Sequence, residues 1–215
     1  MPFGYPIMLE VGGRRALVVG AEAVRQGKVE ALVAAGADVA IVTDERSAAL
    51  DRLEAARTVR IERRAFRAED LEGVFICVAA SDDPAMRELV HREARARGVL
   101  VNVMDDVAHC DFAAPAVVRR GDLLIAIGTS GKSPALARRM REELSERYGP
   151  EWGDVLDLLA EVRGQTLEAL PDLPERSRRW QAALDPDEIA QLVREGMREE
   201  ARRRLQVRLV GAGAR

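Results

Sequence analysis

The stretch RALVVGAEAV, residues 15–24, decides the fold of this 215-residue chain. Its first half is an apolar run that ends at Gly20, which predicts a buried β-strand and a tight turn. A helical pattern then runs over residues 23–35, and Gly36 stands where a helix commonly ends. The stretch therefore predicts a strand, a turn and a helix, in the order with which dinucleotide-binding folds begin.

Four more apolar runs predict strands in the first half of the chain, at residues 38–44, 59–63, 74–80 and 99–104. These runs do not alternate apolar with polar residues, and a helix is predicted over 84–97 between the last two. Strands of this kind lie in parallel sheets whose two faces are covered by helices. We therefore predict a Rossmann-like, doubly wound α/β fold, with its ligand at the carboxyl ends of the strands.

The pattern changes after residue 106. Two strands joined by a turn, and then a helix, are predicted over residues 112–120, 123–127 and 134–148. Ser133 is the expected cap of that helix, and Pro134 suits its first position. From Pro150 the chain is helical and charged, with too few large apolar residues to predict an independent core. This part is expected to pack on the rest of the chain or on a second subunit. The expected regions are an α/β domain, a small α+β region and a helical region, over residues 1–112, 113–149 and 150–215.

Composition excludes several classes of protein. Hydrophobic residues make up 47% and charged residues 32% of the chain, as in folded soluble proteins. A net charge of −3 argues against general nucleic-acid binding, which needs a basic surface. The sequence holds no run of about 18 apolar residues and begins without the pattern of a signal peptide. We therefore expect no membrane partner and a cytoplasmic location.

The two cysteines form no disulfide framework, which suits a reducing compartment. Cys77 lies inside an apolar run and is predicted to be a small core residue. Cys110 lies between His109 and Asp111, a sequence that could hold a metal ion. His91 is the only other histidine, and we find no spaced ligand pair in the chain. A structural role for Cys110 is therefore favoured over a zinc-type site.

The turn at Gly20 is the expected place of a dinucleotide pyrophosphate, because a helix N-terminus attracts negative charge. Only the first glycine of the G-x-G-x-x-G fingerprint is present, since Ala21 and Glu22 follow it. A strand-to-helix turn without a nucleotide therefore stays open as an alternative. Asp44 ends the second predicted strand, where an acidic residue often binds the ribose hydroxyls. An acidic side chain there favours NAD over NADP, whose extra phosphate it would repel.

Two other segments could carry chemistry. Residues 127–133, IGTSGKS, approach a P-loop, but Ala126 replaces its first glycine, so we predict no nucleoside triphosphate there. The small hydroxyl residues, the lysine and the helix N-terminus suit a carboxylate instead. Asp105 and Asp106 follow the last strand of the predicted sheet, at the edge that faces the ligand. One of them could act as a general base or bind a metal, or could merely cap a turn, and spacing alone does not decide.

Several short motifs occur in one collinear order between residues 5 and 145. They are Tyr5-Pro6, Lys28, 35–37, 79–83, 102–105, 110–112 with Pro115, 120–121, 125–127 and 131–134. Together they resemble the precorrin-2 dehydrogenase / sirohydrochlorin ferrochelatase family, the N-terminal module of siroheme synthase. The chain departs from this pattern at Ala21-Glu22, where the family usually has glycines, and at Arg87, where asparagine is common.

The resemblance implies NAD-dependent oxidation of precorrin-2 to sirohydrochlorin, with insertion of ferrous iron (Fe2+) into the product in some members. It implies Asp105 as the catalytic residue, and as a transient metal ligand if iron is inserted. It also implies a homodimer, with residues 113–149 as the dimerisation region. The implied cofactor-binding residues are Gly20, Ala21, Glu22, Ala23, Val24, Thr43, Asp44, Ala80, Ser81 and Asp82. The implied residues that bind the carboxylate-rich tetrapyrrole are Asn102, Arg120, Thr129, Ser130, Gly131, Lys132, Ser133 and Arg138.

Two other functions stay open because Glu22 replaces a fingerprint glycine. One is a chelatase without dehydrogenase activity, and the other is a non-enzymatic tetrapyrrole-binding module. Residues 207–213 also resemble the opening strand of the methyltransferase module that follows in fused siroheme synthases. Seven residues are compatible with either a fusion remnant or coincidence.

Overall fold

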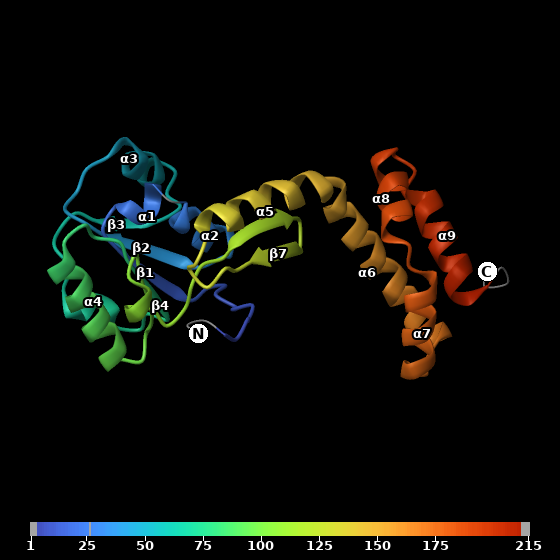
Figure 1. Ribbon diagram of the computed structural model, residues 1–215, viewed down its shortest axis with the longest axis horizontal. Coiled ribbons are helices and arrows are strands. Elements are labelled where there is room, and N and C mark those ends of the chain that lie inside the picture. The colour runs from blue at the N-terminus through green and yellow to red at the C-terminus, as the bar shows by residue number, and fades with distance from the viewer. Residues whose placement is uncertain (1–3, 26, 212–215) are drawn as a thin grey trace. The chain divides into compact units, whose positions relative to one another are not determined.

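The computed structural model describes residues 4–25 and 27–211, and it divides into two compact units between residues 114 and 115. The first unit contains a five-stranded parallel sheet in the order β3-β2-β1-β4-β5 (Figure 1). The strands are β1 (Arg15–Val19), β2 (Asp38–Val42), β3 (Arg60–Glu62), β4 (Ile76–Ala79) and β5 (Leu100–Val103). The strand order reverses between β1 and β4, so the predicted doubly wound α/β fold is confirmed.

Apolar side chains pack on both faces of this sheet. The helices of the unit are α1 (Glu22–Arg25), α2 (Lys28–Ala34), α3 (Ala48–Ala55) and α4 (Pro84–Ala96), with short 3-10 helices η1 (Ala68–Leu71) and η2 (Val107–His109). Alternate side chains of β1 point to opposite faces. Val18 belongs to the cluster of Val29 and Leu50, whereas Leu17 belongs to the cluster of Val90. These two apolar layers hold the carboxyl ends of the strands in fixed positions.

The helix predicted over residues 23–35 is interrupted. Gly27 has a φ of 69°, in the left-handed region, so α1 ends at Arg25 and α2 begins at Lys28. A residue in this conformation breaks the run of helical hydrogen bonds, and glycine adopts it without steric cost. The helix that directly follows the first strand is therefore a single turn, which is a correction to the expected long helix.

The second unit begins with the predicted hairpin and helix. Strands β6 (Ala116–Arg120) and β7 (Leu123–Ile127) pair antiparallel around a turn at Gly121, whose φ is 54°. Helix α5 (Pro134–Arg147) lies along this hairpin (Figure 1). It begins at Ser133, whose hydroxyl accepts a hydrogen bond from a backbone amide of the first turn at 3.2 Å. Both strands and the helix are confirmed, although the first strand is shorter than predicted.

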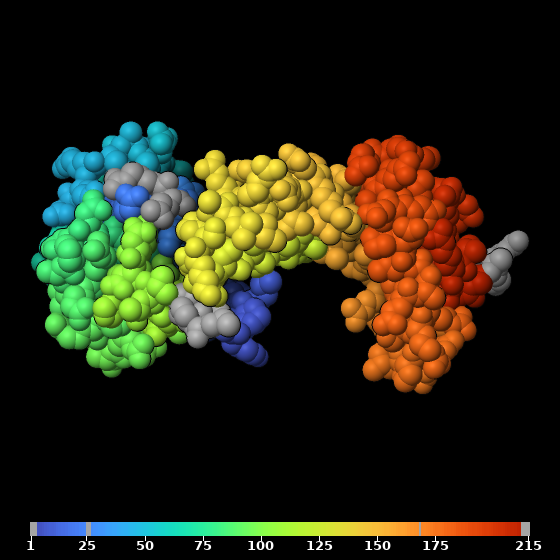
Figure 2. Space-filling model, in the orientation of Figure 1, coloured from blue at the N-terminus to red at the C-terminus, as the bar shows by residue number. Residues whose placement is uncertain are grey.

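Four helices complete the described chain: α6 (Glu151–Ala169), α7 (Leu173–Ala183), α8 (Pro186–Arg194) and α9 (Arg198–Val210). They enclose a core of their own, and the side chains that are at most 2% exposed include Val155, Leu158, Val162, Ile189, Leu205 and Leu209. The space-filling view shows these helices as one contiguous body, orange to red in Figure 2. The expectation that this part lacks an independent core is therefore wrong. Its few apolar residues recur at helical spacing and converge on one interior.

The last helix bears on the resemblance of residues 207–213 to a methyltransferase strand. Residues 207–210 form the final turn of α9 and not a strand, and Gly211 ends the helix with a φ of 85°. Residues 212 and 213, the rest of the segment compared with a methyltransferase strand, lie outside the described residues. Among the helices that the structure describes, none is long and apolar enough to cross a membrane. The functional division at 112/113 and 149/150 stays a prediction.

Candidate active site at the carboxyl edge of the sheet

The turn after β1 brings three strand ends close together. Gly20 has a φ of 97°, and a Cβ atom there would lie 2.5 Å from the carbonyl oxygen of Ala80. Glycine alone fits this approach without a shift of the backbone. The Gly20 amide donates to the Val42 carbonyl at 2.9 Å, and the Ala80 amide donates to the Val19 carbonyl at 2.7 Å. The carboxyl ends of β1, β2 and β4 therefore lie side by side at one edge of the sheet.

An open surface pocket, called the hollow below, lies at this edge of the sheet. Its lining consists of Val19, Gly20, Val42, Thr43, Asp44, Glu45, Arg64, Ala65, Phe66, Ser81 and Met86. Four of the predicted cofactor-binding residues are among them, namely Gly20, Thr43, Asp44 and Ser81. Asp44 is exposed, whereas Thr43 is buried and its hydroxyl accepts a hydrogen bond from the Glu45 amide at 3.1 Å. The hollow lies where the strand order reverses, the place at which doubly wound folds bind ligands.

The other predicted cofactor-binding residues lie beneath or beside the hollow. Four of them pack their side chains in the core, so that only their backbone could face a ligand: Ala21, Ala23, Val24 and Ala80. Glu22 is half-buried in the single turn of α1. Asp82 is exposed just beyond β4, and the Arg87 guanidinium folds back onto the neighbouring Ser81 carbonyl at 2.9 Å. Arg87 therefore braces the loop that closes the hollow on the β4 side.

Lys28, the first residue of α2, reaches the same sheet edge from a different element. Its ammonium donates to Oδ1 of Asn102 on β5 at 3.0 Å. Burial lowers the pKa of Lys28, while negative charge at Cys110 and Asp105 acts in the opposite direction. The Asn102 side-chain amide donates to the Phe112 carbonyl at 2.9 Å. Asn102, predicted to bind substrate, is thus held inside the protein, where it orients Lys28.

The sequence interpretation did not include Lys28 in the site. The signal that could have found it is the position of Lys28 in the collinear motif set, in the helix that follows the first strand. A hydrogen bond between residues 28 and 102 exists only in the folded chain, and nothing in the sequence spacing predicts it.

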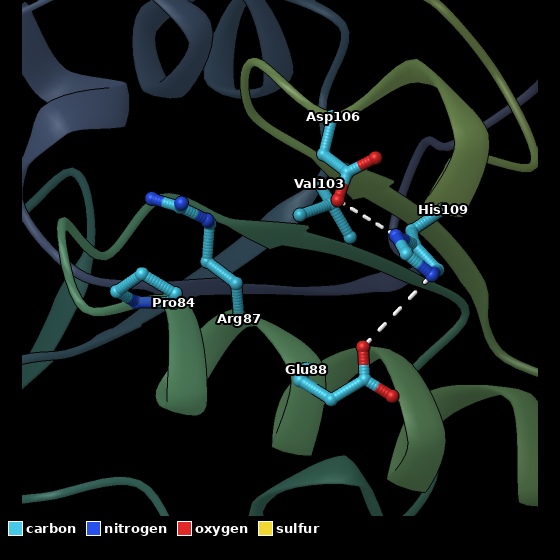
Figure 3. Close-up of a pocket in the computed structure, with 6 residues that line it drawn as sticks. All are labelled: Pro84, Arg87, Glu88, Val103, Asp106 and His109. Atoms are coloured by element: carbon cyan, nitrogen blue, oxygen red, sulfur yellow. Dashed lines mark hydrogen bonds and ion pairs between the residues drawn. The ribbon is translucent and has the colours of Figure 1, made fainter.

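Asp105 and Asp106 occupy different environments. Asp105 is exposed and has a φ of 61°, an uncommon left-handed conformation that turns the chain sharply after β5. Oδ2 of Asp106 accepts a hydrogen bond from Nδ1 of His109 at 2.6 Å (Figure 3). This bond lowers the pKa of Asp106 and raises the pKa of His109. The Asp106 carboxylate is therefore engaged in the hydrogen bond with His109. Asp105 is the carboxylate of this pair whose charge acts to raise the pKa of Lys28.

Cys110 and Asp111 hold the loop after β5 in place, as the favoured structural role predicts. The Cys110 sulfur lies 3.1 Å from both the amide and the carbonyl of Val103, and 3.2 Å from the Asp106 carbonyl. Burial raises the pKa of this thiol. Asp111 accepts a hydrogen bond from the Val101 amide at 3.1 Å. These bonds fasten the segment that carries Asp105 and Asp106 to the end of β5.

The remaining predicted substrate-binding residues lie in the second unit. Arg120 is engaged there in structural bonds, because its guanidinium donates to the carbonyls of Tyr148 at 2.8 Å and Ser145 at 2.9 Å. It therefore fastens β6 to the end of α5. Arg138 is exposed and forms an ion pair with Glu142 at 3.0 Å. The role of both arginines in substrate binding stays a prediction.

The loop before α5 is compact. The Thr129 hydroxyl donates to the Ser133 carbonyl at 3.2 Å, and Ser130 and Gly131 turn the chain with φ of 52° and 74°. Lys132 is exposed beside them. This geometry leaves Lys132 accessible to an anionic ligand, and the predicted role of the five loop residues in substrate binding stays a prediction.

The sheet edge offers two chemical functions. An exposed acid at the hollow suits ribose hydroxyls, and the close glycine turn suits a dinucleotide backbone, so these residues fit NAD. Lys28 and Asp105 supply an ammonium with a lowered pKa and a carboxylate, which can move a proton between them and a bound molecule. Arg64 also lines the hollow, a residue that the sequence interpretation missed. An ion pair with Asp70 at 2.6 Å raises its pKa and holds it in place.

Comparison with known proteins matches both units. Residues 7–116 match a family described as putative NAD(P)-binding, and residues 120–147 match one described as sirohaem biosynthesis protein, central. Among solved structures, the chain is similar to SirC, precorrin-2 dehydrogenase, with a TM-score of 0.69 and 27% identity. The match covers 94% of this chain and 98% of that one.

Curated relatives are longer. Siroheme synthase 1 of Serratia proteamaculans (strain 568) is 36% identical over 201 residues, which cover 94% of this chain and 42% of that protein. Siroheme synthase of Photorhabdus laumondii is 33% identical over 204 residues, which cover 95% and 43%. The chain thus spans less than half the length of these two relatives.

Proposed function

This chain belongs to the family described as putative NAD(P)-binding, and we propose on that premise that it oxidises precorrin-2 to sirohydrochlorin with NAD, which its similarity to siroheme synthases and to a precorrin-2 dehydrogenase supports. The oxidation removes one hydride and one proton from the macrocycle, so it yields NADH and a released proton. One observation carries the proposal. The hollow with Asp44 at its edge and the Lys28–Asp105 pair lie at the same carboxyl edge of one sheet.

The hollow would hold the dinucleotide through few side chains. Asp44 accepts hydrogen bonds from the ribose hydroxyls, which favours NAD over NADP because a 2′-phosphate would be repelled. Gly20 keeps the turn short, so that backbone atoms face the dinucleotide. When bound, NAD supplies the hydride acceptor.

Proton transfer falls to Asp105. Its carboxylate is exposed at the sheet edge and takes the proton that leaves the macrocycle with each hydride. Lys28, held by Asn102, stabilises the negative charge of Asp105 and binds a substrate carboxylate. Lys132 and Arg138 are exposed cations of the second unit, and side chains of this kind pair with carboxylates such as those of a tetrapyrrole.

The decisive experiment follows precorrin-2 oxidation optically with and without NAD, together with NADH formation. We expect Asp105→Asn to lower the NAD-dependent rate by about 100-fold, the scale of a lost general base. Asp157→Asn, an exposed carboxylate of α6, is the matched control and leaves the rate unchanged. Absence of NADH formation by the folded wild-type chain would overturn the proposal.

A second candidate function is insertion of ferrous iron into sirohydrochlorin, which Glu22 favours because it replaces a fingerprint glycine of the nucleotide turn. Iron is a substrate here, and Asp105 takes the pyrrole protons and contacts the ion transiently. Incubation of sirohydrochlorin with Fe2+ in the absence of NAD tests this function. Macrocycle binding without either reaction indicates a tetrapyrrole-binding module instead.

We further propose a cytoplasmic homodimer. Leu136 and Met140 lie one turn apart on α5 and are 52% and 39% exposed, and Val117 of β6 is 37% exposed. Free thiols at Cys77 and Cys110 suit a reducing compartment. Light scattering after gel filtration measures the mass. Leu136→Glu is expected to reduce it to that of one chain, whereas Leu173→Glu, at a leucine of α7 that is 66% exposed, leaves it unchanged.

A further inference from the structure

Helix α4 carries two side chains of the types that coordinate metal ions, one turn apart. Glu88 and His91 are separated by three positions and therefore lie on the same side of the helix. The helix buries Val90 and Ala94 against the sheet, while Glu88 is exposed and His91 half-buried. A Glu-x-x-His pair is the arrangement with which carboxylate-rich metal sites take two ligands from one helix. The sequence interpretation, which found no spaced ligand pair in the chain, missed this one.

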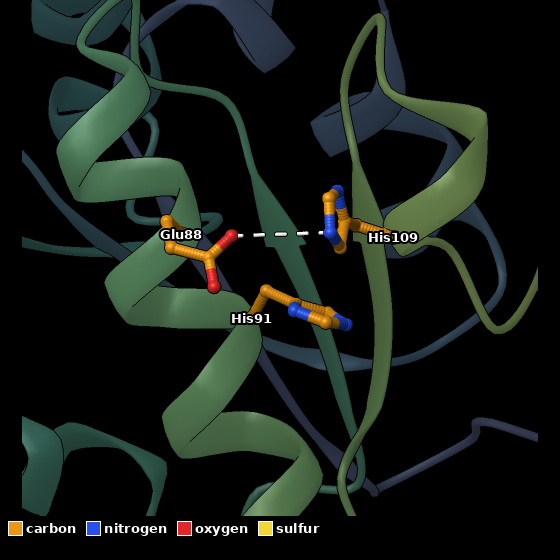
Figure 4. Close-up of side chains that lie close together, drawn as sticks. All are labelled: Glu88, His91 and His109. Carbon is orange, nitrogen blue, oxygen red and sulfur yellow. Dashed lines mark ion pairs between the residues drawn. The ribbon is translucent and has the colours of Figure 1, made fainter.

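The 3-10 helix η2 brings a third side chain to this pair. The His109 ring packs edge-to-face on His91, with ring centroids 4.6 Å apart. Nε2 of His109 lies 3.9 Å from Oε2 of Glu88 (Figure 4). One ligand atom from each of the three residues lies within 4.8 Å of the other two. Two imidazoles and a carboxylate therefore converge from two elements that are far apart in the sequence.

Asp106 orients His109 for coordination. Its Oδ2 accepts a hydrogen bond from Nδ1 of His109 at 2.6 Å, so in the neutral imidazole Nε2 keeps its lone pair. That nitrogen is the one on the Glu88 side (Figures 3 and 4). A carboxylate that holds the outer nitrogen of a histidine is the usual outer-shell partner in metal sites.

An ion pair alone does not account for the cluster. Protonated His109 between Asp106 and Glu88 would explain those two carboxylates, but it gives no role to His91. Within the part of the chain that the structure describes, neither ring nitrogen of His91 has a hydrogen-bond partner. A metal ion bound between the two imidazoles would be coordinated by one of these His91 nitrogens.

The surroundings leave room for coordinated water. Pro84, Arg87, Glu88, Val103, Asp106 and His109 line a cavity of about 190 Å³ (Figure 3). A single water needs roughly 10–15 Å³ on the same measure, so several fit. Bonds of about 2.1 Å place neighbouring ligand atoms roughly 3 Å apart. Because the side chains of Glu88 and His109 are 60% and 40% exposed, rotation about their side-chain bonds can close the remaining distance.

We propose that Glu88, His91 and His109 bind one divalent first-row transition-metal ion, with Asp106 as the partner that orients His109. Two nitrogens and one oxygen select Fe2+, Co2+, Ni2+ or Zn2+ over Mg2+ and Ca2+, which prefer oxygen ligands alone. Three protein ligands leave further positions for water or another molecule. The site is separate from Asp105 and does not depend on the proposed oxidation.

The test titrates the full chain, freed of metal by a chelator, with Co2+. Visible ligand-field absorption and heat of binding are recorded together. We expect one Co2+ per chain, displaced by Zn2+ and not by excess Mg2+. Saturable binding is expected to persist in Asp105→Asn, because Asp105 is not a ligand. Absence of saturable Co2+ binding by the folded wild-type chain overturns the proposal.

Variants identify the ligands. We expect Glu88→Gln, His91→Ala and His109→Ala each to weaken Co2+ binding by more than about 100-fold. Asp106→Asn is expected to weaken it by about 10–100-fold, the range for an outer-shell partner. Glu93→Gln changes the same residue type on the same helix and is the matched control.

Folding of each variant is checked by circular dichroism and thermal unfolding. If His109→Ala does not fold, the Co2+ affinities of Glu88→Gln and His91→Ala test the site. Wild-type Co2+ affinity in both of these variants overturns the proposal. Precorrin-2 oxidation is assayed separately in the presence of a chelator, so that failure of the metal site and failure of the dehydrogenase are distinguished.

Discussion

At the scale of single residues, the site depends on how one half-buried cation, Lys28, is held. Lys28 donates to Asn102, and Asn102 donates in turn to the Phe112 carbonyl. The amide therefore has one orientation, and the ammonium is fixed with it. Burial makes this ammonium easier to deprotonate than that of a free lysine, and the charge of Asp105 partly compensates. A cation tuned in this way can bind a carboxylate and still exchange a proton.

Lys28→Met keeps the length of the side chain and removes its charge. We expect the kcat of precorrin-2 oxidation to fall by about 100-fold, since proton transfer to Asp105 loses its electrostatic support. The pH–rate profile should also shift, which a purely structural role would not cause. Lys28→Arg keeps a charge and should recover part of the rate. Equal kcat and equal pH profiles in Lys28→Met and the wild type would contradict the assignment.

The Asp106–His109 pair makes stability depend on pH. Its hydrogen bond raises the pKa of His109, so the stabilisation from His109 is complete below the unfolded pKa of about 6.5. It is lost as pH rises through the higher folded pKa. The same bond lowers the pKa of Asp106, whose contribution is present above about pH 3.9 and is lost as pH falls through the folded value. The pair thus stabilises most between about pH 4 and pH 6.5.

Urea denaturation of Asp106→Asn tests this dependence, with a chelator present so that metal does not contribute. The midpoint should fall below that of the wild type at about pH 5.5 and approach it at about pH 9. Glu69→Gln, in η1, serves as a control without a histidine partner. A difference between wild type and Asp106→Asn that is the same at both pH values would contradict the prediction.

At the scale of elements, the shape of the hollow depends on the close approach of two backbone segments, Gly20 after β1 and Ala80 after β4. Gly20→Ala places a Cβ 2.5 Å from the Ala80 carbonyl and forces alanine to a φ of 97°. We expect a loss of roughly 2–4 kcal/mol in the free energy of unfolding, from strain and displacement of the strand ends. NAD affinity should fall with it. Chemical denaturation and NAD titration measure the two effects.

Gly164→Ala is the matched control for that substitution. Gly164 lies inside α6 with open space where a Cβ would be, so alanine should be neutral or stabilise by up to about 1 kcal/mol. Equal stability of both variants would show that the approach of β1 to β4 carries no strain.

The same elements show what the sequence could predict. Apolar runs without alternation predict parallel strands, and all five strands of the sheet lie where those runs lie. The break at Gly27 was not predictable from pattern alone, because a glycine inside a helical pattern only lowers the helix propensity. Helix α3 was missed since its polar residues mask the apolar spacing, although Ser47 caps it. Sequence predicts where apolar faces lie better than where helices start.

At the scale of the whole molecule, each unit has its own apolar interior. The clusters of the first unit lie on the two faces of the sheet, and that of α6 to α9 lies among the helices. The family resemblance assigns Thr43 and Ser81 to the cofactor site, and the sequence itself places Asp44 at the edge where parallel strands end. The sequence could not predict contacts between distant side chains, such as His91 with His109.

Leu158→Ala tests the independence of the helical core. This side chain is fully buried, and its truncation should lower the free energy of unfolding by about 2–5 kcal/mol. We expect calorimetry to resolve one transition per unit, with only that of the second unit lowered. Leu167→Ala, on the same helix but 45% exposed, should change little. A parallel shift of both transitions would mean that the units unfold together.

The bonds of Cys110 give the active-site loop a chemical reporter. Cys77 is fully buried, with a pKa raised to about 12, so a thiol reagent cannot reach it in the native fold. Cys110 is half-buried, and its sulfur is tied to Val103 and Asp106. Labelling of Cys110 is therefore expected to speed up when the loop with Asp105 loosens and frees the sulfur from these bonds. The native chain carries a natural single-site probe, whose alkylation rate reports how often that loop opens and how firmly a ligand closes it.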